Sequence, residues 1–208
     1  MTETEKAFAA TLHGPGLDTS RVRLVNGAPT RAVTFRRKPR PRTTCRENIL
    51  PPATEKIVTA KPAAVALFNR VLFDKDWYLD NYLPKYPDEI GLIATMLFAH
   101  ELTHIWQWQN RKLTGYHPLK AASEHGSGTD PYLFDLSNTP KFLDYGYEQQ
   151  GAIVEEFICC RALDPTGART KRLHQMITEV MPMAELKPTR QSDVQLPWDG
   201  VQLNGICE

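Results

Sequence analysis

The sequence predicts an α+β fold, because its strand-like patterns fall early in the chain and its helix-like patterns fall late. Residues 20–27 alternate apolar and basic side chains and stop at an Asn-Gly turn signal, which is typical of a strand. Residues 31–35 and 55–61 are further strand candidates, rich in β-branched side chains. Helical periodicity follows from residue 88 onward, and this segregation of strands from helices favours α+β architecture.

The helices are expected where apolar residues recur at steps of three and four. Asp88 is a plausible N-cap for the longest of them, and the aromatic-rich segment before it, broken by Pro84 and Pro87, is expected to form loop or short turns. The expected helices cover residues 4–12, 88–112, 145–163 and 168–180. We therefore expect one domain over residues 1–182, followed by an extended C-terminal tail over residues 183–208.

The overall charge of the chain does not point to nucleic acid or an anionic membrane as a partner, since the formal net charge is only +1. Residues 36–52 form a basic, proline-rich stretch that reads as a solvated loop, and it lacks the interleaved aromatic residues of a nucleic-acid groove. No segment approaches the roughly 20 apolar residues of a membrane span. The N-terminus carries no secretion-signal pattern, so the expected location is the cytoplasm, or export without a classical signal peptide.

The four cysteines form no C-x-x-C pair. Cys159 and Cys160 are adjacent within an apolar run, which favours reduced, partly buried thiols over a cysteine-based zinc site.

The chemistry is concentrated in "LFAHELTHIWQWQN", residues 97–110. On a helix His100 and His104 lie one turn apart on the same face, so both imidazoles can bind one zinc ion. Glu101 is rotated by about 100° from His100, which suits a general base acting on a water molecule better than a metal ligand. The apolar flanks predict that much of this helix is buried, where ionisable groups need a partner such as a metal.

A catalytic zinc site needs a third protein ligand. Glu148, near the start of the second long helix, is the first choice, and Asp130 and His125 are alternatives. Glu155 lies two turns after Glu148 on the same face, where it could accept a hydrogen bond from a ligand imidazole.

Other residues near this motif are candidates for a direct role in catalysis. His125 could instead stabilise an oxyanion or bind substrate. Tyr145 or Tyr147 could donate a phenolic hydrogen bond to a tetrahedral intermediate, although such tyrosines often only pack.

These motifs resemble those of the zincin metallopeptidases that use glutamate as the third ligand, the gluzincins. The stretches "HELTHIWQ", "DPYLFDL" and "DYGYEQQGAIVE" are most similar to small bacterial metallopeptidase-like domains associated with toxins and contractile injection systems, some of them Vgr-related proteins. The resemblance covers roughly residues 1–165. Gly151 stands where that group usually has alanine, which weakens a helix by roughly 1 kcal/mol.

The resemblance implies a zincin-like fold: a small twisted sheet, an active-site helix with His100 and His104, and a second helix with Glu148. It also implies Glu101 as the base. The leading hypothesis is a zinc peptidase that hydrolyses a peptide or protein substrate, such as a secretion-system-associated effector or processing enzyme. The alternative is a catalytically weak zincin-like module that binds a secretion or toxin partner. In a further alternative, the tail returns over the cleft and Cys207 occupies the fourth zinc position.

Overall fold

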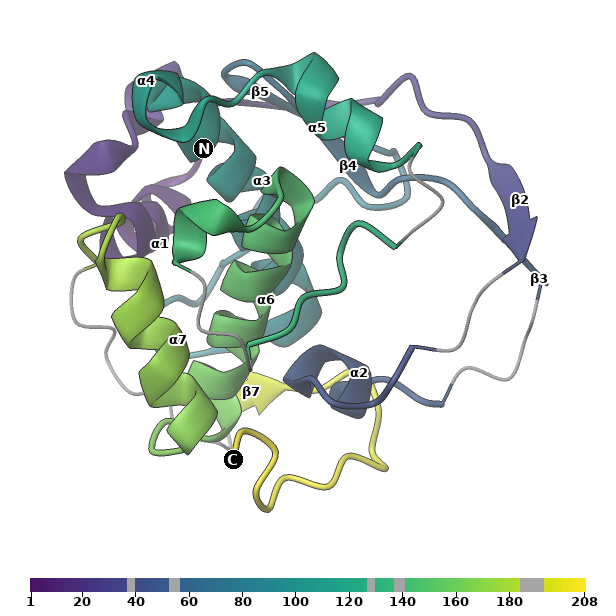
Figure 1. The fold of residues 1–208 in the computed structure, drawn as a ribbon, viewed down its shortest axis with the longest axis vertical. Helices are drawn as coiled ribbons and strands as arrows, with labels where there is room; N and C mark the ends of the chain where they lie inside the picture. Colours follow the sequence, from purple (N-terminus) through teal and green to yellow (C-terminus); the bar gives the residue numbers. More distant parts are fainter. Residues whose placement is uncertain (37–39, 53–56, 127–129, 137–140, 184–192) are drawn as a thin grey trace.

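A computed structural model describes residues 1–36, 40–52, 57–126, 130–136, 141–183 and 193–208. It has the α+β architecture that the sequence predicts (Figure 1). Parts of the predicted basic loop (37–39) and of the predicted tail (184–192) lie outside the described residues.

The strands form small mixed sheets. In the three-stranded sheet, β1 (Arg23–Asn26) pairs in parallel with β5 (Arg70–Phe73), which pairs antiparallel with β4 (Ala64–Leu67). The other strands form two pairs: β2 (Val33–Arg36) with β3 (Ile57–Ala60), antiparallel, and β6 (Ile90–Gly91) with β7 (Val194–Gln195), parallel. Strands β1 and β3 lie within the predicted segments, and β2 extends one residue beyond its segment. Strands β4, β5, β6 and β7 were not predicted.

Two long helices occupy the centre of the molecule. Helix α3 (Leu92–Gln109) packs along α6 (Tyr147–Leu163), and β4 and β5 pack against α3. Helix α1 (Glu3–His13) packs on α3, while α2 (Cys45–Ile49) and α7 (Ala168–Thr178) pack on α6. Short helices complete the path from α3 to α6: α4 (Arg111–Thr114) and α5 (Pro118–Glu124).

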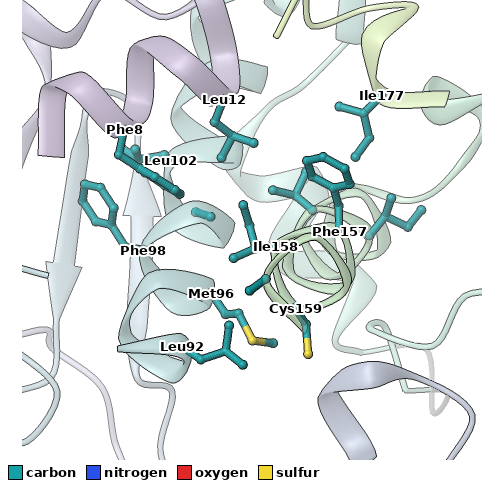
Figure 2. Packing of buried hydrophobic residues seen from close by; sticks show 14 of the residues in the cluster. Phe8, Leu12, Leu92, Met96, Phe98, Leu102, Phe157, Ile158, Cys159 and Ile177 are labelled. Carbon is teal, nitrogen blue, oxygen red and sulfur yellow. The ribbon is translucent and has the colours of Figure 1, made fainter. Parts of the chain in front are cut away.

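The hydrophobic core lies between α1, α3, α6 and α7 (Figure 2). Helix α3 is apolar around most of its circumference and is buried accordingly, as its sequence predicts. The buried side chains that these four helices share include Phe8, Leu12, Met96, Phe98, Leu102, Phe157, Ile158 and Ile177. None of the helices in the described part of the chain is long and apolar enough to cross a membrane.

The start of the longest predicted helix is wrong by four residues. Asp88 does not cap it; α3 begins at Leu92 after Gly91, which offers no side-chain cap. The reason is a long-range contact: Ile90 and Gly91 form strand β6, which pairs with β7 about a hundred residues later in the chain.

The basic stretch 36–52 also differs from the expected loop, because Cys45–Ile49 is helical and Thr44 caps it.

The expectation of reduced cysteines is also wrong. Cys45 is bonded to Cys159, and Cys160 is bonded to Cys207. The two neighbours on α6 therefore attach two different segments to it, α2 on one side and the C-terminal segment on the other. The described part of the tail is thus joined to the rest of the chain through β7 and a disulfide.

Candidate metal centre

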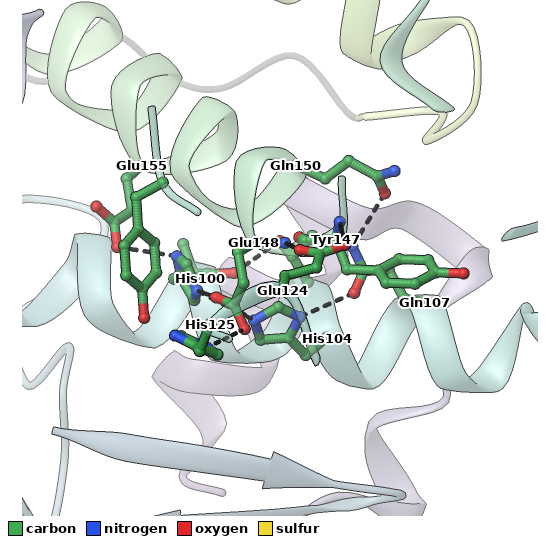
Figure 3. A network of polar contacts seen from close by, with 12 residues as sticks. His100, His104, Gln107, Glu124, His125, Tyr147, Glu148, Gln150 and Glu155 are labelled. Carbon is green, nitrogen blue, oxygen red and sulfur yellow. Dashed lines mark hydrogen bonds and ion pairs between the residues drawn. The ribbon is translucent and has the colours of Figure 1, made fainter. Parts of the chain in front are cut away.

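Three potential ligand atoms converge between α3 and α6 (Figure 3). Nε2 of His100 lies 3.1 Å from Nε2 of His104, and Oε2 of Glu148 lies 3.2 Å from the first and 3.3 Å from the second. All three side chains are buried. Ligand atoms about 2.0–2.1 Å from a tetrahedral zinc ion would be about 3.3 Å apart, so this group could bind a metal ion.

Each imidazole is oriented through its second nitrogen. Nδ1 of His104 lies 2.8 Å from Oε1 of Gln107, which has only acceptor character and therefore calls for a proton on Nδ1. Nδ1 of His100 lies 3.0 Å from a carboxylate oxygen of Glu155, the position expected from its helical spacing. In the neutral form of both rings, a proton on Nδ1 leaves Nε2 facing the centre without one, which is the tautomer that binds a metal.

These orienting groups are themselves held in place. Nη1 of Arg46 on α2 lies 2.6 Å from Oε2 of Glu155; the Glu155 side chain is buried, whereas that of Arg46 is 34% exposed. The side-chain amide of Gln107 donates to Oε1 of Gln150 at 2.9 Å and to the carbonyl of Tyr147 at 3.1 Å. Gln107 therefore links His104 on α3 to α6, the helix that carries Glu148.

Glu101 is buried beside the group. Its Oε2 has no hydrogen-bond partner among the residues that the structure describes. Burial raises the pKa of Glu101, although the neighbouring His100 and His104 lower it in part. A buried carboxylate with a free oxygen and a raised pKa fits the role of a general base that exchanges protons with a reacting molecule.

The ionisable side chains of this group strongly influence one another's pKa. Burial lowers the pKa of His100, but the carboxylates of Glu148 and Glu155 outweigh burial and raise it to about 10. Burial raises the pKa of Glu148, but the imidazoles of His104, His100 and His125 outweigh it and hold that pKa well below its ordinary range. The carboxylate is thus ionised and ready to act as a ligand.

Gly151 has a steric role that its sequence context did not reveal. It lies one turn after Glu148 on α6, and the His100 ring packs directly over its backbone. A Cβ at this position would lie 2.5 Å from Cε1 and 2.7 Å from Nδ1 of His100, far inside van der Waals contact. The missing side chain makes room for the ligand imidazole.

The first turn of α6 is fixed by a carboxylate from outside the helix. Oε1 of Glu124 accepts from the backbone N–H of Tyr147 at 2.9 Å, and Oε2 accepts from that of Glu148 at 3.0 Å. This satisfies two N–H groups that a helix start leaves without partners, and the N-cap residue Gly146 offers no side chain for the task. Glu124 therefore sets the position of Glu148.

His125 and Asp130, the alternative third ligands, do not take a ligand position, and Tyr147, the candidate hydrogen-bond donor, is turned elsewhere. Nε2 of His125 lies 3.2 Å from Oε1 of Glu148, the oxygen that faces away from the other imidazoles. Asp130 forms a two-point ion pair with Arg40. The Tyr147 hydroxyl donates to the carbonyl of Gly115 at 2.9 Å, so it points away from the group; the ring near His100 and His125 belongs to Tyr132, with centroids 5.9 and 5.7 Å away.

The proposal that Cys207 is a fourth ligand is wrong. Cys207 is bonded to Cys160, which lies twelve residues, or about 18 Å, along α6 from Glu148. Its sulfur is therefore both bonded and distant from the ligand atoms.

Several residues of the site were not found from the sequence: Gln107, Glu124, Arg46 and Tyr132. Gln107 carried a usable signal, because it lies three residues after His104 and thus on the same helix face. Tyr132 lies in the stretch "DPYLFDL", but the sequence assigned it no role. Glu124 and Arg46 carried no signal, because their roles depend on chain segments that meet only in the folded molecule.

Comparisons with known proteins bear on the fold. No protein-family model and no curated protein matches the sequence. The structure is similar to the effector domain of Pseudomonas aeruginosa VgrG2b, with a TM-score of 0.52 and 20% sequence identity, over 94% of this chain and 83% of that one. The chain thus shares the fold of a bacterial effector domain, with a buried His–His–Glu group that could bind a metal.

Proposed function

We propose that the protein is a zinc-dependent peptidase. The observation that carries this proposal is the convergence of Nε2 of His100, Nε2 of His104 and Oε2 of Glu148, at mutual distances of 3.1–3.3 Å. The donor set of two imidazoles and one carboxylate suits catalytic zinc, and three protein ligands leave one tetrahedral position for a reacting molecule. The unpartnered oxygen of Glu101 beside this group supports catalysis over a purely structural site.

Each residue of the site has a separate role in this proposed reaction. His100, His104 and Glu148 would hold the ion, and a bound zinc ion polarises a peptide carbonyl and lowers the pKa of water. Glu101 takes a proton from the attacking water and delivers it to the leaving amine nitrogen, for which its raised pKa is suited. His125 is half-exposed beside Glu148, where it can donate a hydrogen bond to a substrate oxygen.

The first experiment measures metal content and peptide hydrolysis together. Purified wild-type protein is expected to hold about one zinc ion per chain and to cleave a casein or peptide-library substrate. Glu101→Gln should retain zinc and lose at least about 99% of turnover, since loss of a general base typically costs 10²–10⁴-fold. His104→Ala should lose zinc and activity together.

Two outcomes would change the proposal. Loss of zinc in Glu101→Gln would show that Glu101 is needed for metal binding and refute its assignment as the base. A wild-type protein that binds zinc but cleaves no substrate in the library would favour the alternative, a zincin-like module that binds a secretion or toxin partner.

We also propose that the protein works outside the reducing cytoplasm, as a secretion-associated effector. Two buried disulfides support an oxidising compartment, because such bonds are rare in cytosolic proteins. The fold similarity to an effector domain supports the association with secretion. Thiol labelling of the protein recovered from producing cells and from their surroundings would test this: only the exported pool should resist labelling.

A further inference from the structure

We propose that Arg46 is a positioning residue of the metal centre, and that the Cys45–Cys159 disulfide holds it in place. Metal affinity then depends on a covalent bond formed outside the site. This inference rests on metal binding at His100, His104 and Glu148, which the proposed function also requires.

The first step of the argument is the chain of contacts from the centre to α2. Nδ1 of His100 lies 3.0 Å from Oε1 of Glu155, and Oε2 of Glu155 lies 2.6 Å from Nη1 of Arg46. Only one oxygen of the carboxylate faces the imidazole, because the other is engaged by the guanidinium. Arg46 therefore sets the rotation of the carboxylate that sets the rotation of the ligand ring.

The second step is the weakness of α2 as an isolated element. It has only five residues, Cys45–Ile49, which is far too short to be stable alone. Parts of the chain on either side of it are irregular. Arg46 therefore stays over Glu155 only if α2 is attached to α6 by other means.

The third step is that the attachments come from neighbouring residues on α6. Glu156, the residue after Glu155, accepts hydrogen bonds from the backbone N–H of Cys45 at 2.9 Å and of Arg46 at 3.4 Å. Cys159, one turn further, is bonded to Cys45 itself. A single turn of α6 thus fixes both the backbone and the side-chain contact of Arg46.

The same helix offers a matched control. Cys160 is the next residue and forms the other disulfide, but with Cys207 in the C-terminal segment, whose described residues make no polar contact with His100, His104 or Glu148. Replacing either pair removes one buried disulfide from the same turn of α6. Only the Cys45–Cys159 bond joins α2 covalently to α6, so only its loss is expected to release Arg46.

The experiment measures the zinc dissociation constant by competition with a chromophoric chelator at one fixed pH. Arg46→Gln should weaken zinc binding about tenfold or more, the lower end of the effect of removing groups that orient metal ligands. Arg46→Lys should recover most of the affinity, since an ammonium group can also pair with Glu155. Arg46→Gln should have no further effect in a Glu155→Gln background, because the two residues act through one contact.

The disulfide is tested by two double variants with circular dichroism as the check on folding. Cys45→Ala with Cys159→Ala should weaken zinc binding as Arg46→Gln does, whereas Cys160→Ala with Cys207→Ala should leave it within about twofold of wild type. Equal losses from the two pairs would overturn the role of the Cys45–Cys159 bond. If the first pair fails to fold, the Arg46 variants still decide the positioning role.

The two proposals fail separately. A wild-type protein that binds one zinc ion, with unchanged affinity in Arg46→Gln, would overturn this inference and leave the proposed function standing. A wild-type protein that binds no zinc would overturn both.

Discussion

The lack of a side chain at Gly151 allows the His100 ring to pack against the backbone of α6. A helix interior normally disfavours glycine by roughly 1 kcal/mol relative to alanine, so the sequence alone presents Gly151 as a weakness. In the structure the His100 ring occupies the place where Cβ would be. Glycine lowers the helix propensity of α6 at this position, but it allows His100 of α3 to lie close to α6.

We therefore predict that Gly151→Ala weakens zinc binding by at least about tenfold, because the added carbon displaces the His100 ring. The free energy of unfolding should change little or fall, since the gain in helix propensity of roughly 1 kcal/mol is opposed by about 1–3 kcal/mol of overpacking. Chelator competition and chemical denaturation would measure the two quantities.

Gly126→Ala is the control for this substitution. A Cβ at Gly126 would meet only the carbonyl oxygen of Ser123, at an ordinary contact distance of 3.5 Å, so zinc affinity should stay at the wild-type value. Full zinc affinity in Gly151→Ala would contradict the steric role of Gly151.

At the scale of elements, α1 meets α3 through a buried polar contact. His13 ends α1, is fully buried, and has Nε2 3.4 Å from the Thr103 hydroxyl. Burial lowers its pKa from 6.5 to about 3, so His13 is neutral in the folded protein at neutral pH. In the unfolded chain it binds a proton near its ordinary pKa.

This difference predicts acid sensitivity. Between pH 6.5 and about 3 the unfolded chain holds one more proton at His13 than the folded protein. Above pH 6.5 His13 is neutral in both states and does not lower the free energy of unfolding. As the pH drops from 6.5 to about 3, protonation of His13 in the unfolded chain lowers the free energy of unfolding by up to about 1.4 kcal/mol per pH unit. His13→Gln should give a shallower decline in denaturation experiments on the metal-free protein; an identical slope would argue against a neutral buried His13.

The elements also differ in how well the sequence predicts them. Helices α1, α6 and α7 follow from local periodicity and were predicted to within about two residues at each end. The start of α3 was not, because its position depends on pairing between β6 and β7. The hairpin of β4 and β5 was missed because its turn contains Phe68 with a positive φ of 57° instead of the Asn-Gly or Asp-Gly signal of such turns.

At the scale of the whole molecule, the candidate metal ligands were easier to bring together from the sequence than the residues that surround them. His100 and His104 lie one helical turn apart, so their proximity is a local property of the sequence. The contact of Arg46 with Glu155 joins residues more than a hundred positions apart, and it depends on a disulfide whose partners could not be deduced from four cysteines alone.

The two disulfides also decide what happens when the backbone is cut. One closes a loop over residues 45–159 and the other over residues 160–207, so the peptide bond from Cys159 to Cys160, within buried α6, is the junction between the loops. A nick inside either loop leaves both fragments covalently joined.

After limited trypsin treatment that cuts once within residues 46–158, we predict one full-length band on a non-reducing gel and two bands after reduction. Separation without reductant would contradict the pairing. A chain built this way keeps α3 and α6 joined after a first cut between them.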